Sequence, residues 1–182
     1  MKKKYIYITL IKIFSTAFIL ASCSSAPKRA TEVFAVRNGS ADQVDLGNKA
    51  VMQANYDTAI TYFKEAVRLA TLADDSACRV HAKLALGNGY QAQGKTKEAS
   101  DTWNSALADA QLSGSNYLIS AANIFIARGQ LSSGKDAQKV KETIEQYKGG
   151  VSQNELYTAT AWQTLGLAEK ELVALLRILR VP

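Results

Sequence analysis

The sequence predicts an all-α fold in which antiparallel helix pairs stack on one another. From Ala41 onward, apolar residues recur at helical rather than alternating spacing. This part of the chain contains only one proline, Pro182. A set of small and apolar residues also recurs after 40 positions, which indicates an array of repeats.

The first 22 residues are expected to be a cleaved signal peptide. Lysines at positions 2–4 form a basic start, and residues 13–20 are almost wholly apolar before the small residues Ala21 and Ser22. A membrane-spanning helix needs about 20 apolar residues, so this run is too short to cross a bilayer.

The segment Leu20-Ala21-Ser22-Cys23 resembles the lipobox of bacterial lipoproteins. The resemblance implies a diacylglyceryl thioether on Cys23, cleavage before it and acylation of the new amino group. Ser24 replaces the aspartate that signals inner-membrane retention in enterobacterial lipoproteins, so we expect a lipid-anchored protein of the outer membrane that faces the periplasm. The alternative is an ordinary secretory signal with a structural Cys23. Residues 23–40 are expected to be the lipidated cysteine and a flexible tether.

The charge of the chain comes largely from the leader. The whole chain has a formal net charge of +6, but the leader holds four of the 22 basic residues and none of the 16 acidic ones. The remaining 18 basic residues leave a net charge of only about +2, so nucleic acid is not expected as a partner. With Cys23 lipidated, Cys78 is expected to be a small buried hydrophobe, and His81, the single histidine, an ordinary polar side chain.

Residues 41–182 are expected to form one helical repeat domain. Asp74, Asp75 and Ser76 are good N-cap residues, and segments 113–116 and 149–154 mark later breaks. The expected helices are 41–54, 56–73, 76–93, 95–112, 116–131, 136–148 and 153–179. They pair into repeats 41–73, 76–112, 116–148 and 153–182, the last one incomplete.

Two copies of the repeat share small residues where helices cross and an aromatic residue that follows them. These positions are Gly47, Ala59, Phe63 and Ala66 in the first copy, and Gly87, Ala99, Trp103 and Ala106 in the second, which adds the aromatic Tyr90. The pattern Leu-Gly-x2-Tyr-x3-Gly-x4-Ala-x3-Trp-x2-Ala resembles a tetratricopeptide (TPR) repeat. The resemblance implies a short right-handed solenoid, in which the small residues allow close helix approach and the aromatic rings fill the gap towards the next pair.

The later copies are less regular. Ala127 fits the first helix of a third copy, but the second helix fits only if the register slips by one residue, which places Val140, Ile144 and Tyr147 on its apolar stripe. The first-helix signature appears once more, in Trp162, Leu165 and Gly166.

The end of the chain is unusually apolar for a repeat array. Residues 169–179 continue without glycine, whereas such arrays normally end in a polar-faced helix. Three explanations remain open: a helix packed on the array, a helix that contacts a partner or a membrane, and a truncated gene.

The resemblance also selects candidate binding residues, because in tetratricopeptide proteins the first helix of each pair lines the inner face. The position after the signature glycine is Asn48, then Asn88, then Arg128. Asparagine can donate to and accept from an extended peptide backbone, and arginine can hold a carboxylate. Met52 and Leu84 suggest that the groove also accepts an apolar segment. The alternative is that these polar residues are simply solvated.

The sequence favours no enzymatic activity, because the chain has no phosphate-binding glycine loop, no His-Glu-x2-His motif and no nucleophile elbow. No cofactor, metal or small-molecule substrate is expected. The sequence favours a lipid-anchored scaffold or adaptor that binds another envelope protein or a peptide, in envelope or pilus assembly. The alternatives are a regulator of a cell-wall synthase and a surface-exposed lipoprotein that contacts a host.

Overall fold

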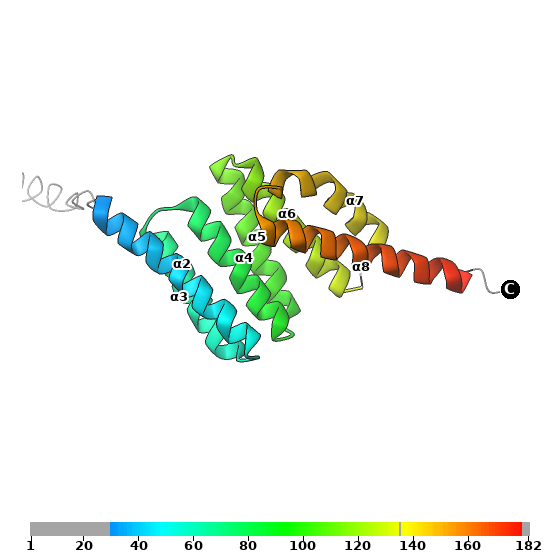
Figure 1. The fold of residues 1–182 in the computed structure, drawn as a ribbon, viewed down its shortest axis with the longest axis horizontal. Coiled ribbons are helices and arrows are strands. Elements are labelled where there is room, and N and C mark those ends of the chain that lie inside the picture. The colour runs from blue at the N-terminus through cyan, green and yellow to red at the C-terminus, as the bar shows by residue number, and fades with distance from the viewer. Residues whose placement is uncertain (1–29, 135, 180–182) are drawn as a thin grey trace, which may run out of the picture. The chain divides into compact units, whose positions relative to one another are not determined.

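The computed structural model of the chain describes residues 30–134 and 136–179. Within these ranges the backbone forms seven α-helices and one short 3-10 helix, and it contains no strand (Figure 1). Residues from Phe34 onward belong to one compact unit. The predicted all-α class is therefore confirmed. The elements are α2 (Ala30–Met52), α3 (Tyr56–Leu72), α4 (Ser76–Ala92), α5 (Thr96–Ser113), α6 (Asn116–Ser132), α7 (Ala137–Tyr147), η1 (Lys148–Val151) and α8 (Glu155–Leu179).

Consecutive helices pack side by side as antiparallel neighbours. The chain of contacts runs from α3 to α4, α5, α6, α7 and α8, and Phe63 of α3 lies against Gly47 of α2. Three pairs result, α2 with α3, α4 with α5 and α6 with α7, and α8 takes the place of the first helix of a fourth pair. In the part of the chain that the structure describes, no second helix follows α8. This stacking of helix pairs is a TPR-like repeat fold.

The turns between helices recur at a fixed spacing. Ala54, Asp74, Gly94, Gly114 and Gly134 all have positive φ, and each follows the previous one by 20 residues. A residue in this left-handed conformation ends a helix and lets the chain reverse, and glycine adopts it without steric cost. Because two such turns complete one helix pair, this spacing accounts for the 40-residue period of the sequence.

The turn at Ala54 predicts a stabilising substitution, because alanine at φ 57° is strained where glycine is not. Ala54→Gly is expected to raise the free energy of unfolding by about 0.5 to 1 kcal/mol. The measurement is urea unfolding. Ala108→Gly serves as the control: it removes the side chain of an exposed alanine inside α5 and should lower stability by a similar amount. A loss of stability in both variants would contradict the inference that the turn at Ala54 is strained.

The core lies where the second helix of each pair packs on the first. Phe63 and Trp103 are 1% exposed, and both rings lie against glycine backbones. Phe63 contacts Gly47 of α2, and Trp103 lies between Gly87 of α4 and Gly129 of α6. The neighbouring small residues are completely buried: Ala59, Ala66, Ala99 and Ala106. In α7, Val140 and Ile144 are buried while Lys139 is exposed, as the slipped register requires.

The first helix that the structure describes starts earlier than expected. Residues 30–40, predicted to be part of a tether, are helical, and α2 begins at Ala30 rather than at residue 41. Ser40 is buried, and its hydroxyl donates to the carbonyl oxygen of Ala66 at 2.9 Å. Packing on α3 therefore holds a helix through the Asn38-Gly39 pair, whose local preference is for a turn. Residues 23–29 of the predicted tether and Cys23 lie outside the described residues.

The fourth copy of the signature does not pack as predicted. Leu165 is buried, but Trp162 is 55% exposed and no atom lies within 4 Å of a Cβ built on Gly166. The ammonium of Lys148 lies 4.5 Å from the centre of the Trp162 ring. In a complete fourth pair, the second helix would pack on the side of α8 that carries Trp162 and Gly166. In the described chain neither residue packs against another helix in this way, so their predicted packing roles are wrong.

None of the helices in residues 30–134 and 136–179 combines the length and the apolar character that crossing a bilayer demands.

Candidate partner-binding face

The three predicted ladder residues occupy equivalent places on three successive first helices. Asn48 on α2, Asn88 on α4 and Arg128 on α6 each directly follow the buried small residue of the repeat. Asn48 is exposed, and Asn88 and Arg128 are half-buried. Among the described residues these side chains form no hydrogen bond or ion pair with another side chain or with the backbone. Their polar groups are thus free to bind a partner.

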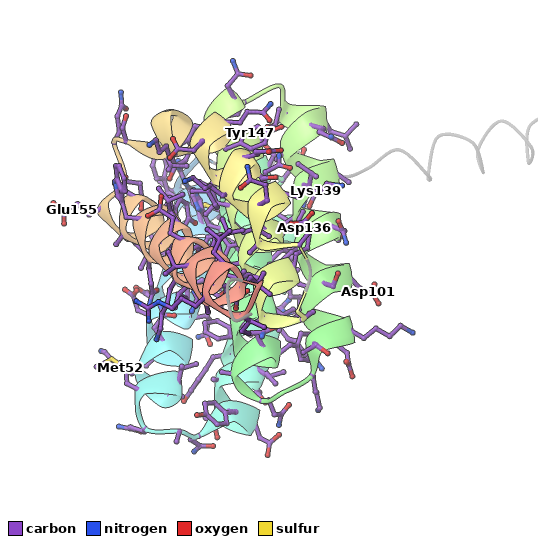
Figure 2. All side chains as sticks on the ribbon, turned by 90° about the vertical axis from the view of Figure 1, so that its right-hand side faces the viewer. Met52, Asp101, Asp136, Lys139, Tyr147 and Glu155 are labelled. Atoms are coloured by element: carbon purple, nitrogen blue, oxygen red, sulfur yellow. The ribbon has the colours of Figure 1, made fainter. Side chains whose placement is uncertain are left out.

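The two apolar residues predicted for the groove lie in different surroundings. Met52, at the end of α2, is 87% exposed and projects from the edge of the molecule (Figure 2). Leu84 is only 1% exposed, and its carbonyl oxygen accepts the indole N–H of Trp103 at 3.2 Å. Leu84 therefore belongs to the core and cannot contact a partner, because α6 packs over this side of α4.

An aromatic cluster that sequence reasoning missed lies on the same side of α4 as Asn88. His81 precedes Asn88 by seven residues, or two helical turns, so both side chains share one face of α4. The His81 ring stacks on Tyr157 of α8, with 5.5 Å between ring centres, and its Nδ1 is hydrogen-bonded to the Tyr157 hydroxyl. Tyr117 and Phe125 of α6 complete the cluster, at 6.1 and 5.5 Å from the Tyr157 ring.

The cluster joins three first helices, α4, α6 and α8, through residues far apart in the chain. Tyr117 and Tyr157 are themselves 40 residues apart and lie at the starts of their helices, so the period of the repeat was the signal that could have related them. Their contact with His81 depends on how the first helices of different pairs lie in space, which the period does not reveal. One end of the face that carries Asn88 is therefore filled by aromatic side chains.

The charged groups beside the cluster are held by structural contacts. Asp75 caps α4, because its carboxylate accepts the backbone N–H of Cys78 at 2.9 Å, and it pairs with Arg37 at 3.1 Å. Burial opposes ionisation of Asp75, but this hydrogen bond and the Arg37 charge hold the pKa of its carboxyl below the usual value. Cys78 is half-buried, and burial raises the pKa of its thiol.

Burial lowers the pKa of His81, although the Asp75 carboxylate opposes this shift. Burial also raises the pKa of Tyr157 well above its ordinary value. Both side chains are thus neutral near pH 7. Their contact is a hydrogen bond between two uncharged groups rather than an ion pair.

The lowered pKa of His81 predicts that acid weakens the fold. The unfolded chain binds the proton of His81 more readily than the folded one, so this contribution to stability is present above the unfolded pKa of about 6.5 and is lost as the pH falls towards the folded value. Between pH 7.5 and 5.5 the free energy of unfolding is expected to fall by up to about 1 kcal/mol. Urea unfolding at both pH values measures this loss.

His81→Gln is the matched control for this effect, because glutamine keeps a polar side chain that does not titrate. The variant should lose less stability between pH 7.5 and 5.5 than the parent chain. An equal loss in both proteins would show that other groups, such as Asp75 and the remaining carboxyls, produce the pH dependence.

An open hollow of about 360 Å³ adjoins the cluster at Tyr117. Its other lining residues come from η1 and from the segment before α8: Gly149, Gly150, Ser152, Gln153 and Asn154. Backbone groups and short amide or hydroxyl side chains dominate this wall, so it suits hydrogen bonding to a peptide backbone better than burial of an apolar group. In the described residues no three His, Cys, Asp or Glu side chains are grouped as a metal site would require.

No protein-family model and no curated protein matches the chain. Among solved structures, the chain is similar to the crystal structure of a Podosopora anserina protein described as a kinesin light chain with nearly identical TPR-like repeats. The sequence identity is 16% and the TM-score is 0.49, over 92% of this chain and 84% of the other.

Proposed function

We propose that this protein is a scaffold that binds an extended segment of another protein along the face carrying Asn48, Asn88 and Arg128. The observation that carries the proposal is the repetition of unpaired polar side chains at one place on three stacked first helices. Amides at regular intervals can pair with the N–H and C=O groups of an extended chain, and the guanidinium can hold a carboxylate.

The proposed role is binding rather than catalysis. The charged groups near the face are engaged in holding helices together: Asp75 caps α4 and pairs with Arg37, and Asp109 of α5 accepts from Lys83 and Arg79 of α4 at 2.7 and 3.1 Å. A catalytic acid or base needs a substrate within hydrogen-bond reach, whereas these groups are committed to each other.

The proposed site of action is the bacterial envelope, with the protein held at the outer membrane by lipid on Cys23 and its partner another envelope protein. The support is the lipobox-like segment of the sequence. A single acyl chain binds a bilayer only marginally, so the two or three chains of a lipoprotein would be needed for durable attachment.

Incorporation of labelled palmitate in the native host tests the anchor. The wild-type chain is expected to take up label, and a Cys23→Ser variant is expected to take up none. Absence of label from the wild-type protein would contradict the lipoprotein proposal while leaving the partner-binding face untouched.

Substitution of the ladder tests the binding face. Replacing Asn48, Asn88 and Arg128 together with alanine should weaken partner binding by roughly 2 to 4 kcal/mol, if each side chain contributes one hydrogen bond and the arginine a charge-assisted one. The measurement is recovery of the partner after crosslinking in living cells, followed by mass spectrometry.

The matched control removes three exposed polar side chains from the second helices: Lys97, Asp101 and Lys139. Asp101 lies at the opposite edge of the molecule from Met52 in Figure 2. The control should recover as much partner as the wild-type chain. Unchanged recovery in the ladder variant would show that the partner binds elsewhere.

A further inference from the structure

The last helix continues past the core of the molecule. On α8 the residues packed into the core end with the half-buried Leu172, yet the helix runs to Leu179. Continuing the 20-residue spacing of turns beyond Gly134 gives positions near residues 154 and 174, but at the second of these the chain stays helical. Residues 173–178, here called the overhang, extend beyond the other helices (Figure 1).

The overhang is apolar over most of its circumference. Five of its six residues are apolar, and at 100° per residue its four large apolar side chains spread over roughly 220° of the helix, with Arg177 on the remaining side. Its large apolar side chains are well exposed: Val173 48%, Leu175 53%, Leu176 59% and Ile178 69%. A partner helix covers only a stripe of roughly 100°. An apolar surface of this width is covered more completely by a continuous apolar medium than by one partner helix.

A second copy of the chain is a poor cover for the overhang. At roughly 100 Å² for each aliphatic side chain, the four large side chains from each of two copies would bury about 800 Å², which is below the ~1,200 Å² at which stable interfaces begin. For a protein held at a membrane, as proposed above, that continuous apolar medium is the lipid bilayer.

The apolar side and the charges of the overhang fit the interfacial region of a bilayer. A helix bound there lies along the bilayer surface, with its apolar side ~5–10 Å deep and its polar side towards the headgroups. Exposed Lys170 and Arg177 are seven residues apart and so share one face, from which long basic side chains can reach lipid phosphates. The neighbouring Glu169 is paired with Lys141 at 3.0 Å, and Glu171 lies on a different face.

We propose that residues 173–178 of α8 insert into the interfacial region of an anionic lipid bilayer, with Lys170 and Arg177 directed to the phosphates. This contact depends neither on acylation of Cys23 nor on the face that carries Asn88. It gives the protein a second attachment to a membrane. In the sequence, this attachment lies at the opposite end of the repeat array from the leader.

Vesicle flotation tests this attachment directly. The chain from residue 23 onward, carrying Cys23→Ser so that neither leader nor lipid contributes, is mixed with phosphatidylcholine vesicles with or without phosphatidylglycerol. The protein is expected to float with the anionic vesicles. Changing Leu175, Leu176 and Ile178 together to serine should reduce vesicle binding by more than about tenfold, because each buried methylene contributes to partitioning.

A control variant changes three other well-exposed apolar residues to serine: Met52, Leu112 and Leu156. It should float as the parent chain does. None of the six substituted residues is in the core, so both variants should give the far-UV circular dichroism and the unfolding midpoint of the parent.

Three results would overturn the proposal. The first is a parent chain that does not float with anionic vesicles, and the second is a serine variant of the overhang that floats as well as the parent. The third is a parent chain that is dimeric in sedimentation without vesicles while the overhang variant is monomeric, since a second copy would then cover the overhang. Equal flotation with neutral vesicles, or no effect of Lys170→Glu with Arg177→Glu, would overturn the assignment of an anionic surface.

Discussion

Replacing Trp103 with alanine is expected to lower the free energy of unfolding by about 3 to 5 kcal/mol. The ring is 1% exposed and fills the space between the glycine backbones of Gly87 and Gly129, so its loss leaves a cavity shared by α4, α5 and α6. The substitution also removes the hydrogen bond that the indole donates to the Leu84 carbonyl. Urea unfolding followed by circular dichroism measures the loss.

Trp162→Ala is the matched control, because it removes the same side chain from an exposed position. Trp162 is 55% exposed and contacts Lys148 through its ring face, so its removal should cost less than about 1 kcal/mol. A smaller loss from Trp103→Ala than from Trp162→Ala would contradict the assignment of the two tryptophans to core and surface.

Gly87→Ala is expected to lower stability by about 1 to 3 kcal/mol, although alanine is the better helix former. A Cβ at this position would lie 2.8 Å from Cε2 of Trp103 and closer still to two further ring atoms, Nε1 and Cδ1. The rigid ring is buried against α6 on its other side, so it cannot move away. Overpacking therefore outweighs the gain in helix propensity, and thermal unfolding measures the sign and size of the effect.

Gly166→Ala makes the same chemical change at the equivalent signature position of α8, with the opposite expected sign. Nothing lies within 4 Å of a Cβ built there, so alanine should raise stability by about 0.5 to 1 kcal/mol through helix propensity alone. If Gly87→Ala and Gly166→Ala changed the stability in the same direction, the assignment of Gly166 to an open face of α8 would be contradicted.

The fold could be predicted largely because its key contacts repeat at short, regular separations. Gly47 meets Phe63 and Gly87 meets Trp103 at the same spacing of 16 residues, so one internal comparison identifies both crossings. The slipped register of α7 was also visible, since only the set with Val140 and Ile144 keeps an apolar stripe. These relations lie within one helix pair, where sequence spacing determines the contact.

Contacts between different pairs were not predictable in the same way. The helix around Gly39 is supported by the contact of Ser40 with α3, Leu84 is buried because α6 covers it, and Trp162 is exposed in the described chain. His81 and Tyr157 are 76 residues apart and belong to different helix pairs, so their contact depends on where α4 and α8 lie. Each of these depends on where a whole helix lies, which local patterns do not specify.

The aromatic cluster narrows the surface that a partner can use. At one end of the face, His81 is covered by Tyr157 of α8, and Phe125 of α6 is only 1% exposed. The polar groups left for a partner are those of Asn48, Asn88 and Arg128, with Met52 exposed at the end of α2. A bound segment is therefore expected to lie towards the carboxyl ends of α2, α4 and α6.

Site-specific photocrosslinking in the native host tests this account most directly. A photoreactive amino acid is placed at position 88 on the proposed binding face of α4, or at position 101 on the exposed side of α5 (Figure 2). The account predicts a discrete crosslinked partner from position 88 and none from position 101. The same partner captured equally from both positions, or from position 101 alone, would contradict binding along the face that carries Asn48, Asn88 and Arg128.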